Sequence, residues 1–139
     1  MSRDEQTLED QLHVLGADRA PRITPDHIDS LIVGEFYKRG SAFYDTLPGT
    51  PLGEYVNESM SCLTICVLVL RNGFTVIGTS ACASPENYNE YIGRKLARKK
   101  ARDQIWPLEG YRLRTDLSHP LTRMLRAKGD EEKQPSPKA

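Results

Sequence analysis

The sequence predicts an α+β domain, in which a small antiparallel sheet centred on a β-hairpin (residues 63–82) is packed by a long helix (84–106) and an N-terminal helix (25–36). Three observations predict it. Two apolar runs flank Asn72-Gly73, a dipeptide typical of tight hairpin turns. Two further segments, at Thr24-Pro25 and Ser84-Pro85, each begin with a hydroxyl residue followed by Pro, which is typical of a helix start.

The hairpin is expected to close through a two-residue turn at Asn72-Gly73. That turn would place Arg71 opposite Phe74 and Val69 opposite Val76. Both faces of the resulting strands are apolar, and an apolar face has to be covered. The sequence therefore predicts a central hairpin that is covered on both faces.

The long helix is expected to begin at Ser84-Pro85 and to end at Trp106, because Pro107 cannot continue the hydrogen-bond ladder. Small residues recur along it at every fourth position and predict a face that packs closely on the sheet. This stripe consists of Gly93, Ala97, Ala101 and Ile105, and Ile92 and Leu96 are expected to widen the buried face.

The remaining segments divide the chain into a flexible arm (1–22), one domain (23–126) and a disordered tail (127–139). Within the domain, Thr24-Pro25 starts the N-terminal helix, whose apolar spacing extends to Phe36. Prolines and glycines predict a long loop over residues 41–60, with a short strand near Phe43-Tyr44. Residues 111–114 are expected to be extended, and a last short helix is expected over residues 118–126.

Composition limits the classes of function. At 139 residues and 38% hydrophobic content, the chain supports one domain with a modest core. Lys and Arg total 19 and so do Asp and Glu, so no global positive field favours nucleic-acid binding. No apolar run is long enough to span a membrane, and no basic-then-apolar leader is present, which predicts a cytoplasmic protein.

Catalytic and metal-binding patterns are weak in this sequence. It has no nucleophile elbow, phosphate-binding glycine loop or metal-binding helix motif, so we expect a protein that is not an enzyme and uses no cofactor. The three cysteines, Cys62, Cys66 and Cys82, are interpreted as reduced thiols that behave as small hydrophobic residues. No second paired cluster completes a tetrahedral zinc site with them.

The strongest chemical signal is a row of arginines, Arg94, Arg98 and Arg102, which borders the packed stripe of the long helix. Guanidinium groups one helical turn apart can hold neighbouring phosphate oxygens, and three nearby lysines add positive potential. The alternative is a solvated helix flank whose long side chains lie over the core.

Several short segments resemble a family of small phage proteins named from gene product forty-nine of one phage and gene sixty-six of another. The resemblance spans residues 23–113 and implies a phage or prophage origin; the family name states no activity. The segment between Phe36 and Met60 departs from it, being longer than in the family. The segments that carry it are Ile23–Ile32, Asn72–Val76, Ser80–Cys82, Ile92–Lys95 and Ile105–Tyr111.

The hairpin, the long helix and the arginine pair are also similar to phage sponges, which sequester nucleotide signals of Thoeris and related cyclic-oligonucleotide defences. Those sponges are non-enzymatic oligomers. The resemblance implies that Phe74 stacks on a base, that Ser84 lies in a polar pocket, and that Arg98 and Arg102 hold phosphates.

These expectations combine into one functional prediction: a phage-encoded anti-defence protein that binds a small cyclic nucleotide with Arg98, Arg102, Arg94, Phe74 and Ser84 and forms a homo-oligomer. Two alternatives remain open. A phage accessory protein would bind and inhibit a host protein through an exposed apolar patch. A small nucleic-acid-binding protein would use the same basic helix and show a steep salt dependence.

Overall fold

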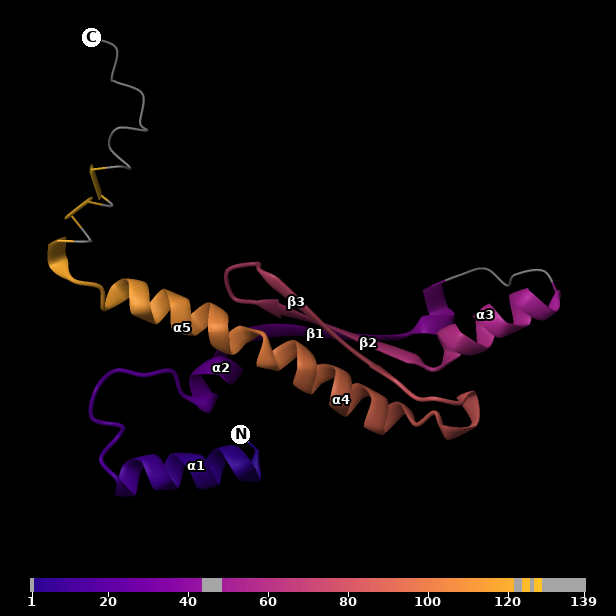
Figure 1. Ribbon diagram of the computed structural model, residues 1–139, viewed down its shortest axis with the longest axis horizontal. Coiled ribbons are helices and arrows are strands. Elements are labelled where there is room, and N and C mark those ends of the chain that lie inside the picture. Colours follow the sequence, from indigo (N-terminus) through magenta and orange to yellow (C-terminus); the bar gives the residue numbers. More distant parts are fainter. Residues whose placement is uncertain (1, 44–48, 122–123, 126, 129–139) are drawn as a thin grey trace, which may run out of the picture.

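A three-stranded antiparallel sheet in the order β1-β2-β3 forms the centre of the molecule (Figure 1). The structure is a computed structural model that describes residues 2–43, 49–121, 124–125 and 127–128. Strands β1 (Ile32–Arg39), β2 (Leu63–Leu70) and β3 (Thr75–Ala81) are packed by helices, so the predicted α+β class is confirmed.

The predicted two-residue hairpin turn is wrong by one residue. The Leu70 amide donates to Phe74 O over 2.8 Å, so three residues, Arg71 to Gly73, form the loop, and Val69 pairs with Thr75. Within this loop only Gly73 has a positive φ, of 89°, whereas the expected turn needs positive φ at Asn72 as well. Asn72 instead accepts the Phe74 amide on its side chain over 3.0 Å.

One face of the sheet forms the core and the other does not. Alternate residues of β2, including Cys66 and Leu68, are buried beneath α4 (Glu90–Asp103), which packs on β2 and β3. The opposite face carries Phe36 and Ile77, which are 62% and 53% exposed. The prediction that both faces are covered is therefore wrong within the described part of the chain.

Close approach of α4 to the sheet confirms the small-residue stripe. Ala97, Ala101 and Ile105 are fully buried. A Cβ atom built on Gly78 of β3 would lie 2.0 Å from Ala97 O, so the helix backbone fits only against glycine there. The prediction for the two flanking residues is wrong, since Ile92 and Leu96 are 53% and 48% exposed.

The predicted bounds of the long helix are wrong at both ends. Ser84 makes no side-chain cap and precedes only a short 3₁₀ turn, η2 (Pro85–Asn87). Asn89 caps α4 instead, accepting the Ile92 amide over 2.9 Å. The chain breaks at Gln104 and continues as α5 (Ile105–Asp116), which includes the segment expected to be extended. Pro107 fits there because a first-turn residue needs no amide donor within the helix.

The N-terminal helix is shorter than predicted. Thr24 caps α2 (Pro25–Leu31) by accepting the His27 amide over 3.1 Å, which confirms the expected start. The chain then becomes strand β1 at Ile32, so Phe36 lies on the sheet. The β-branched pair Ile32-Val33 followed by Gly34 favours a strand over continued helix.

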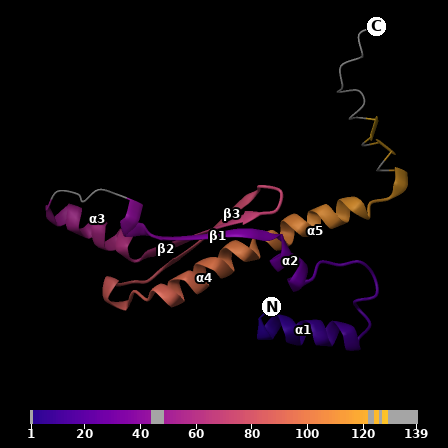
Figure 2. The same ribbon diagram turned by 180° about the vertical axis from the view of Figure 1, so that it is seen from behind.

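The segment expected to be a loop is partly helical. It contains the 3₁₀ turn η1 (Gly40–Phe43) and helix α3 (Pro51–Ser61), which Thr50 caps through the Gly53 amide. The expected strand at Phe43-Tyr44 is wrong at Phe43, and Tyr44 lies outside the described residues. In Figures 1 and 2, α3 lies beyond one end of the sheet and α5 beyond the other.

The predicted arm contains helix α1 (Arg3–Val14). It begins with a reciprocal cap, in which Ser2 accepts the Glu5 amide and the Glu5 carboxylate accepts the Ser2 amide. Helical conformation is described at Pro120-Leu121 and Met124-Leu125, within the last predicted helix. Most of the predicted tail, from residue 129, lies outside the described residues.

Candidate functional site: a pocket with two arginines

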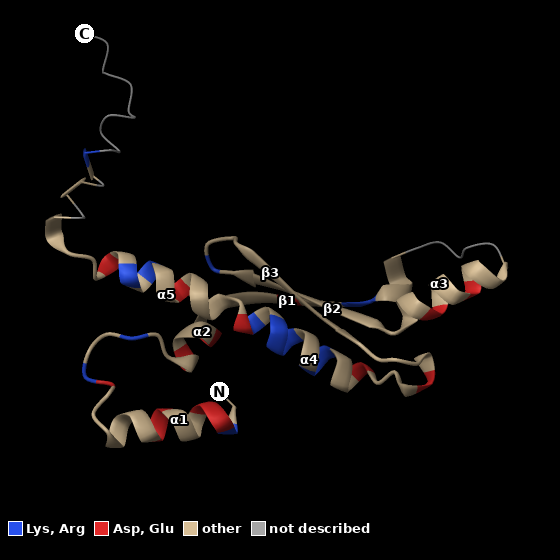
Figure 3. Ribbon diagram, in the orientation of Figure 1, with Lys and Arg blue, Asp and Glu red and all other residues tan. Residues whose placement is uncertain are grey.

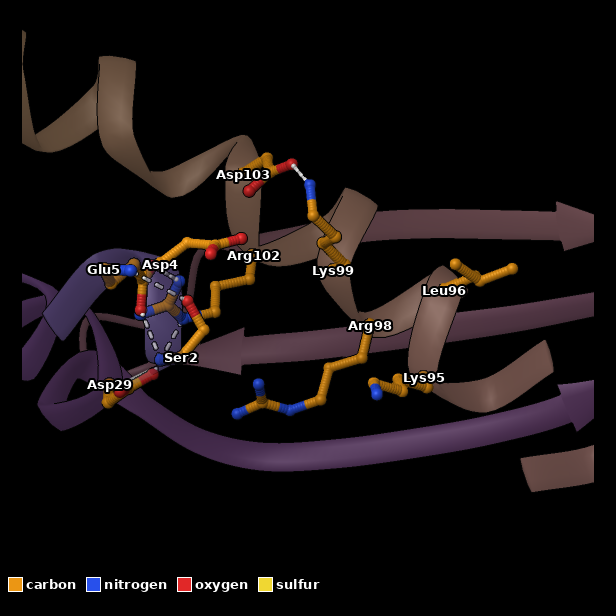
Figure 4. A pocket seen from close by; sticks show the side chains of 10 residues that line it. All are labelled: Ser2, Asp4, Glu5, Asp29, Lys95, Leu96, Arg98, Lys99, Arg102 and Asp103. Atoms are coloured by element: carbon orange, nitrogen blue, oxygen red, sulfur yellow. Dashed lines mark hydrogen bonds and ion pairs between the residues drawn. The ribbon is translucent and has the colours of Figure 1, made fainter. Parts of the chain in front are cut away.

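A pocket of about 670 Å³ lies where α1, α2 and α4 meet (Figure 4). Its α4 wall contains Arg98 and Arg102, which the sequence placed together because residues four apart share a helix face. The described lining residues are Ser2, Asp4, Glu5, Asp29, Lys95, Leu96, Arg98, Lys99, Arg102 and Asp103.

Arg102 is the most constrained basic residue of the pocket, with its side chain only 10% exposed. Its Nε donates to Asp29 Oδ1 over 2.8 Å, and its two terminal nitrogens donate to the two carboxylate oxygens of Glu5. It also reaches the Pro25 carbonyl at 3.4 Å. A buried guanidinium needs such partners, because an unpaired charge is costly away from water.

Arg98 is more accessible, with a side chain that is 34% exposed. Its Nε donates to Glu35 Oε1 of β1 over 2.9 Å. The Tyr37 hydroxyl donates to the other oxygen of the same carboxylate over 3.2 Å. Burial and the Glu35 charge raise the pKa of Tyr37 to about 12, so the phenol stays protonated near neutral pH.

The carboxylates around Arg102 are held in their charged form. Burial pushes the pKa of Glu5 upward, but hydrogen bonds from Arg102 and Ser2 outweigh it and leave the pKa below its usual value. Burial opposes ionisation of Asp29 as well, and its bond to Arg102 again lowers the pKa. Near neutral pH the pocket therefore holds charged groups of both signs.

Comparison with known proteins gives one match. Residues 23–117 match the family described as phage protein (N4 Gp49/phage Sf6 gene 66). The chain belongs to this phage protein family. The matched region includes Arg98 and Arg102 and excludes α1. No curated protein and no solved structure matched the chain.

In this family member the other predicted site residues do not line the arginine pocket. Arg94 forms an ion pair with Glu90 and lies 5.1 Å from the Tyr37 ring centre, outside the described pocket lining. Phe74 is 53% exposed at the hairpin loop, beside Gln104 of the α4–α5 junction. Ser84 follows the opposite end of β3. Of the five predicted site residues, only Arg98 and Arg102 line this pocket.

Sequence reasoning missed the acidic half of the site. Glu5, Asp29 and Glu35 come from α1, α2 and β1, which are distant from α4 in the chain. No local spacing signals such pairs. The capping box at Ser2 was a readable signal for α1 itself, because Ser followed three residues later by Glu is typical of a helix start.

The described residues contain no group of three or more His, Cys, Asp or Glu side chains placed to hold a metal ion. None of their helices is long and apolar enough to cross a membrane. The three cysteines are free thiols, and Cys62 and Cys66 are buried as expected.

Proposed function

We propose that this phage protein binds a small cyclic nucleotide immune signal in the host cytoplasm and sequesters it without converting it. The observation that carries the proposal is the pair of guanidinium groups, Arg98 and Arg102, in one pocket of about 670 Å³. Pockets of roughly 300–1,000 Å³ are typical of small-molecule sites. Lys95 and Lys99 line the same wall and add positive charge.

Helix geometry supports recognition of phosphates. Residues four apart on an α-helix rise by about 6 Å, so Arg98 and Arg102 can each engage a separate phosphate. A guanidinium binds carboxylate and phosphate through the same forked pair of donors. The carboxylates now held by these arginines therefore occupy positions that phosphate oxygens would take.

Sequestration is favoured over turnover by the groups that line the pocket. The described lining offers ammonium, guanidinium and carboxylate groups together with the hydroxyl of Ser2, and neither His nor Cys is among them. Ser2 is committed to capping α1 rather than to a neighbouring base. Ionic contacts with these arginines and lysines would hold the ligand without forming or breaking a covalent bond.

Calorimetry tests the proposal against cyclic di- and trinucleotides and cyclic ADP-ribose isomers. Arg98→Ala should weaken binding at least tenfold, because a charge-assisted hydrogen bond contributes about 1.5–3 kcal/mol. Arg112→Ala is the matched control, since Arg112 pairs with Glu109 and Asp116 on α5. Chromatography should show that the released ligand is intact. A cleaved product would indicate that the protein catalyses a reaction and does not sequester the ligand.

Arg102→Lys provides a second variant, because truncating Arg102 removes its ion pairs with Asp29 and Glu5 and risks unfolding. Lysine keeps the charge and loses the fork. We expect weaker ligand binding with an unchanged circular-dichroism spectrum. Equal affinity of Arg102→Lys and the unaltered protein would argue against forked phosphate recognition.

Inhibition of a host protein is the second candidate, and the exposed apolar sheet face around Phe36 and Ile77 favours it. A phage plating assay on a host with a nucleotide-signalling defence separates the two. Loss of protection by Arg98→Ala alone supports the nucleotide site, whereas loss by Phe36→Glu alone, with Arg98→Ala still protective, supports a protein target.

Nucleic-acid binding is less favoured by the local charges. Four basic residues of α4 already pair with carboxylates: Arg94, Arg98, Lys99 and Arg102. A long polyanion would have to displace several of these partners at once. Binding to duplex DNA that weakens steeply with salt would restore this alternative.

A further inference from the structure

Helix α1 places the Glu5 carboxylate against Arg102, in the position that a ligand phosphate would take. Both terminal nitrogens of Arg102 donate to Glu5, one to each carboxylate oxygen, and the Nε group is left to Asp29 of α2. Figure 4 shows Glu5 and Asp29 reaching this guanidinium from separate elements. Glu5 therefore fills the end of Arg102 that faces away from Asp29.

The charge of the pocket depends on α1. The described lining contains four basic side chains, Lys95, Arg98, Lys99 and Arg102, against four acidic ones, Asp4, Glu5, Asp29 and Asp103. Two of the acidic residues, Asp4 and Glu5, belong to α1. Figure 3 shows acidic residues in the first turn of α1 and a band of basic residues on α4. Without α1 the same lining holds four basic residues against two acidic ones.

Little apolar contact holds α1 in place. None of its residues is buried, and Leu8 and Val14 are 55% and 81% exposed. Glu9 pairs with Arg22 in the segment that follows α1, which steadies the arm but not its attachment to α4. A 12-residue helix is marginally stable alone, so we expect α1 to lose helical structure when it leaves the pocket.

We propose that α1 is a displaceable acidic cap on the arginine pocket, in which Glu5 occupies the Arg102 fork until a phosphorylated ligand replaces it. This inference rests on the proposed function of the pocket. Asp29 stays on Nε throughout and keeps the guanidinium oriented. The cap also selects the ligand class, because a ligand must supply enough negative charge to replace both Glu5 and Asp4.

The test compares two full-length variants with the same change of charge. Glu5→Gln removes the carboxylate from Arg102, whereas Asp10→Asn removes one whose described hydrogen bond is from Gln6 within α1. Inorganic pyrophosphate serves as the probe, because it carries the phosphate chemistry without a base. Calorimetry measures its affinity, and hydrogen exchange of residues 3–14 reports whether α1 is docked.

Pyrophosphate should raise hydrogen exchange of residues 3–14 in the unaltered protein and in Asp10→Asn. In Glu5→Gln, residues 3–14 should exchange hydrogen rapidly even without pyrophosphate. This variant should also bind pyrophosphate about threefold to tenfold more tightly, because the ligand no longer has to displace the Glu5 carboxylate from Arg102. Asp10→Asn should bind as the unaltered protein does.

Two results overturn the proposal and can be told apart. Equal pyrophosphate affinity in all three proteins, with unchanged hydrogen exchange of residues 3–14, would refute the proposed cap but not the proposed binding pocket. Absence of pyrophosphate binding in all three proteins, Glu5→Gln included, would refute both the proposed function of the pocket and the proposed cap.

Discussion

At the scale of single residues, Gly78 sets how closely the helix can approach the sheet. A Cβ atom there would lie 2.0 Å from Ala97 O and 2.4 Å from Ala101 N, both of which are backbone atoms that cannot rotate away. Gly78→Ala should therefore lower the free energy of unfolding by about 2 kcal/mol or more. Chemical denaturation measures it.

Gly110→Ala is the matched control. Gly110 lies inside α5, and a Cβ atom built there meets nothing within 4 Å. Alanine is a better helix former than glycine, so this variant should be more stable by about 0.5–1 kcal/mol. The packing account fails if both substitutions change stability equally.

Acid should loosen the contact between α1 and Arg102. The pKa values of Glu5 and Asp29 lie below their ordinary 4.5 and 3.8, so these groups stabilise the folded chain as carboxylates. Their contribution is complete above about pH 4.5 and is lost as the pH falls through the lowered values. The melting temperature of Glu5→Gln should therefore approach that of the unaltered protein as the pH falls below about 4.5. A difference in melting temperature that stays constant as the pH is lowered would contradict this.

The sequence predicts one half of the candidate site well. Arg98 and Arg102 are four residues apart on a helix, and that spacing puts both side chains on one helix face. Glu5 and Glu35 lie far from α4 in the chain and meet it only through the tertiary fold. Local patterns contain no information on such pairs, so the sequence does not predict the carboxylates that bind these arginines.

At the scale of elements, capping chemistry predicts where helices begin only when the right cap is chosen. Thr24 caps α2 as expected, while Thr50 in front of Pro51 was overlooked because the nearby glycines indicated a loop. Pro107 was expected to end a helix but lies in the first turn of the next one. Proline suits either position, so the residue alone does not decide between them.

Two substitutions before α4 test its observed start. Asn89 accepts the Ile92 amide over 2.9 Å, whereas Ser84 makes no side-chain cap. Asn89→Ala should reduce the free energy of unfolding by about 0.5–2 kcal/mol, and Ser84→Ala should leave it nearly unchanged. Urea titration distinguishes the two, and a larger loss for Ser84→Ala would place the functional cap at the predicted position instead.

At the scale of the whole molecule, the uncovered face of the sheet is the main feature that a single copy leaves unexplained. Phe36, Val67 and Ile77 form its central row, and Lys38 is the charged residue among those that the strand pairing places on this face. We propose that a second copy covers it, since two such faces can stack as a sandwich without repulsion between many like charges.

The size of this face limits the strength of the expected contact. Three strands of about seven residues cover roughly 330 Å², against about 800 Å² per partner in a standard interface. We therefore expect association at micromolar concentrations and not an obligate dimer. Multi-angle light scattering should show dimers or larger assemblies for the unaltered protein, and a monomer for Phe36→Glu.

Tyr111→Glu is the control for that substitution, because Tyr111 is also an exposed aromatic residue, at 79%, and belongs to α5, which lies beyond one end of the sheet (Figure 1). It should associate as the unaltered protein does. A strictly monomeric unaltered protein at micromolar concentration would refute the oligomer. Binding of a different protein to the same face would assign it to a host partner.

Native mass spectrometry of the protein purified from cells with an active nucleotide-signalling defence tests the central proposal most directly. We expect the protein to carry an additional mass equal to that of an intact cyclic nucleotide, released on denaturation and absent from Arg98→Ala prepared in the same way. An unaltered protein that carries no nucleotide, from cells in which the signal is present, would contradict the proposed function.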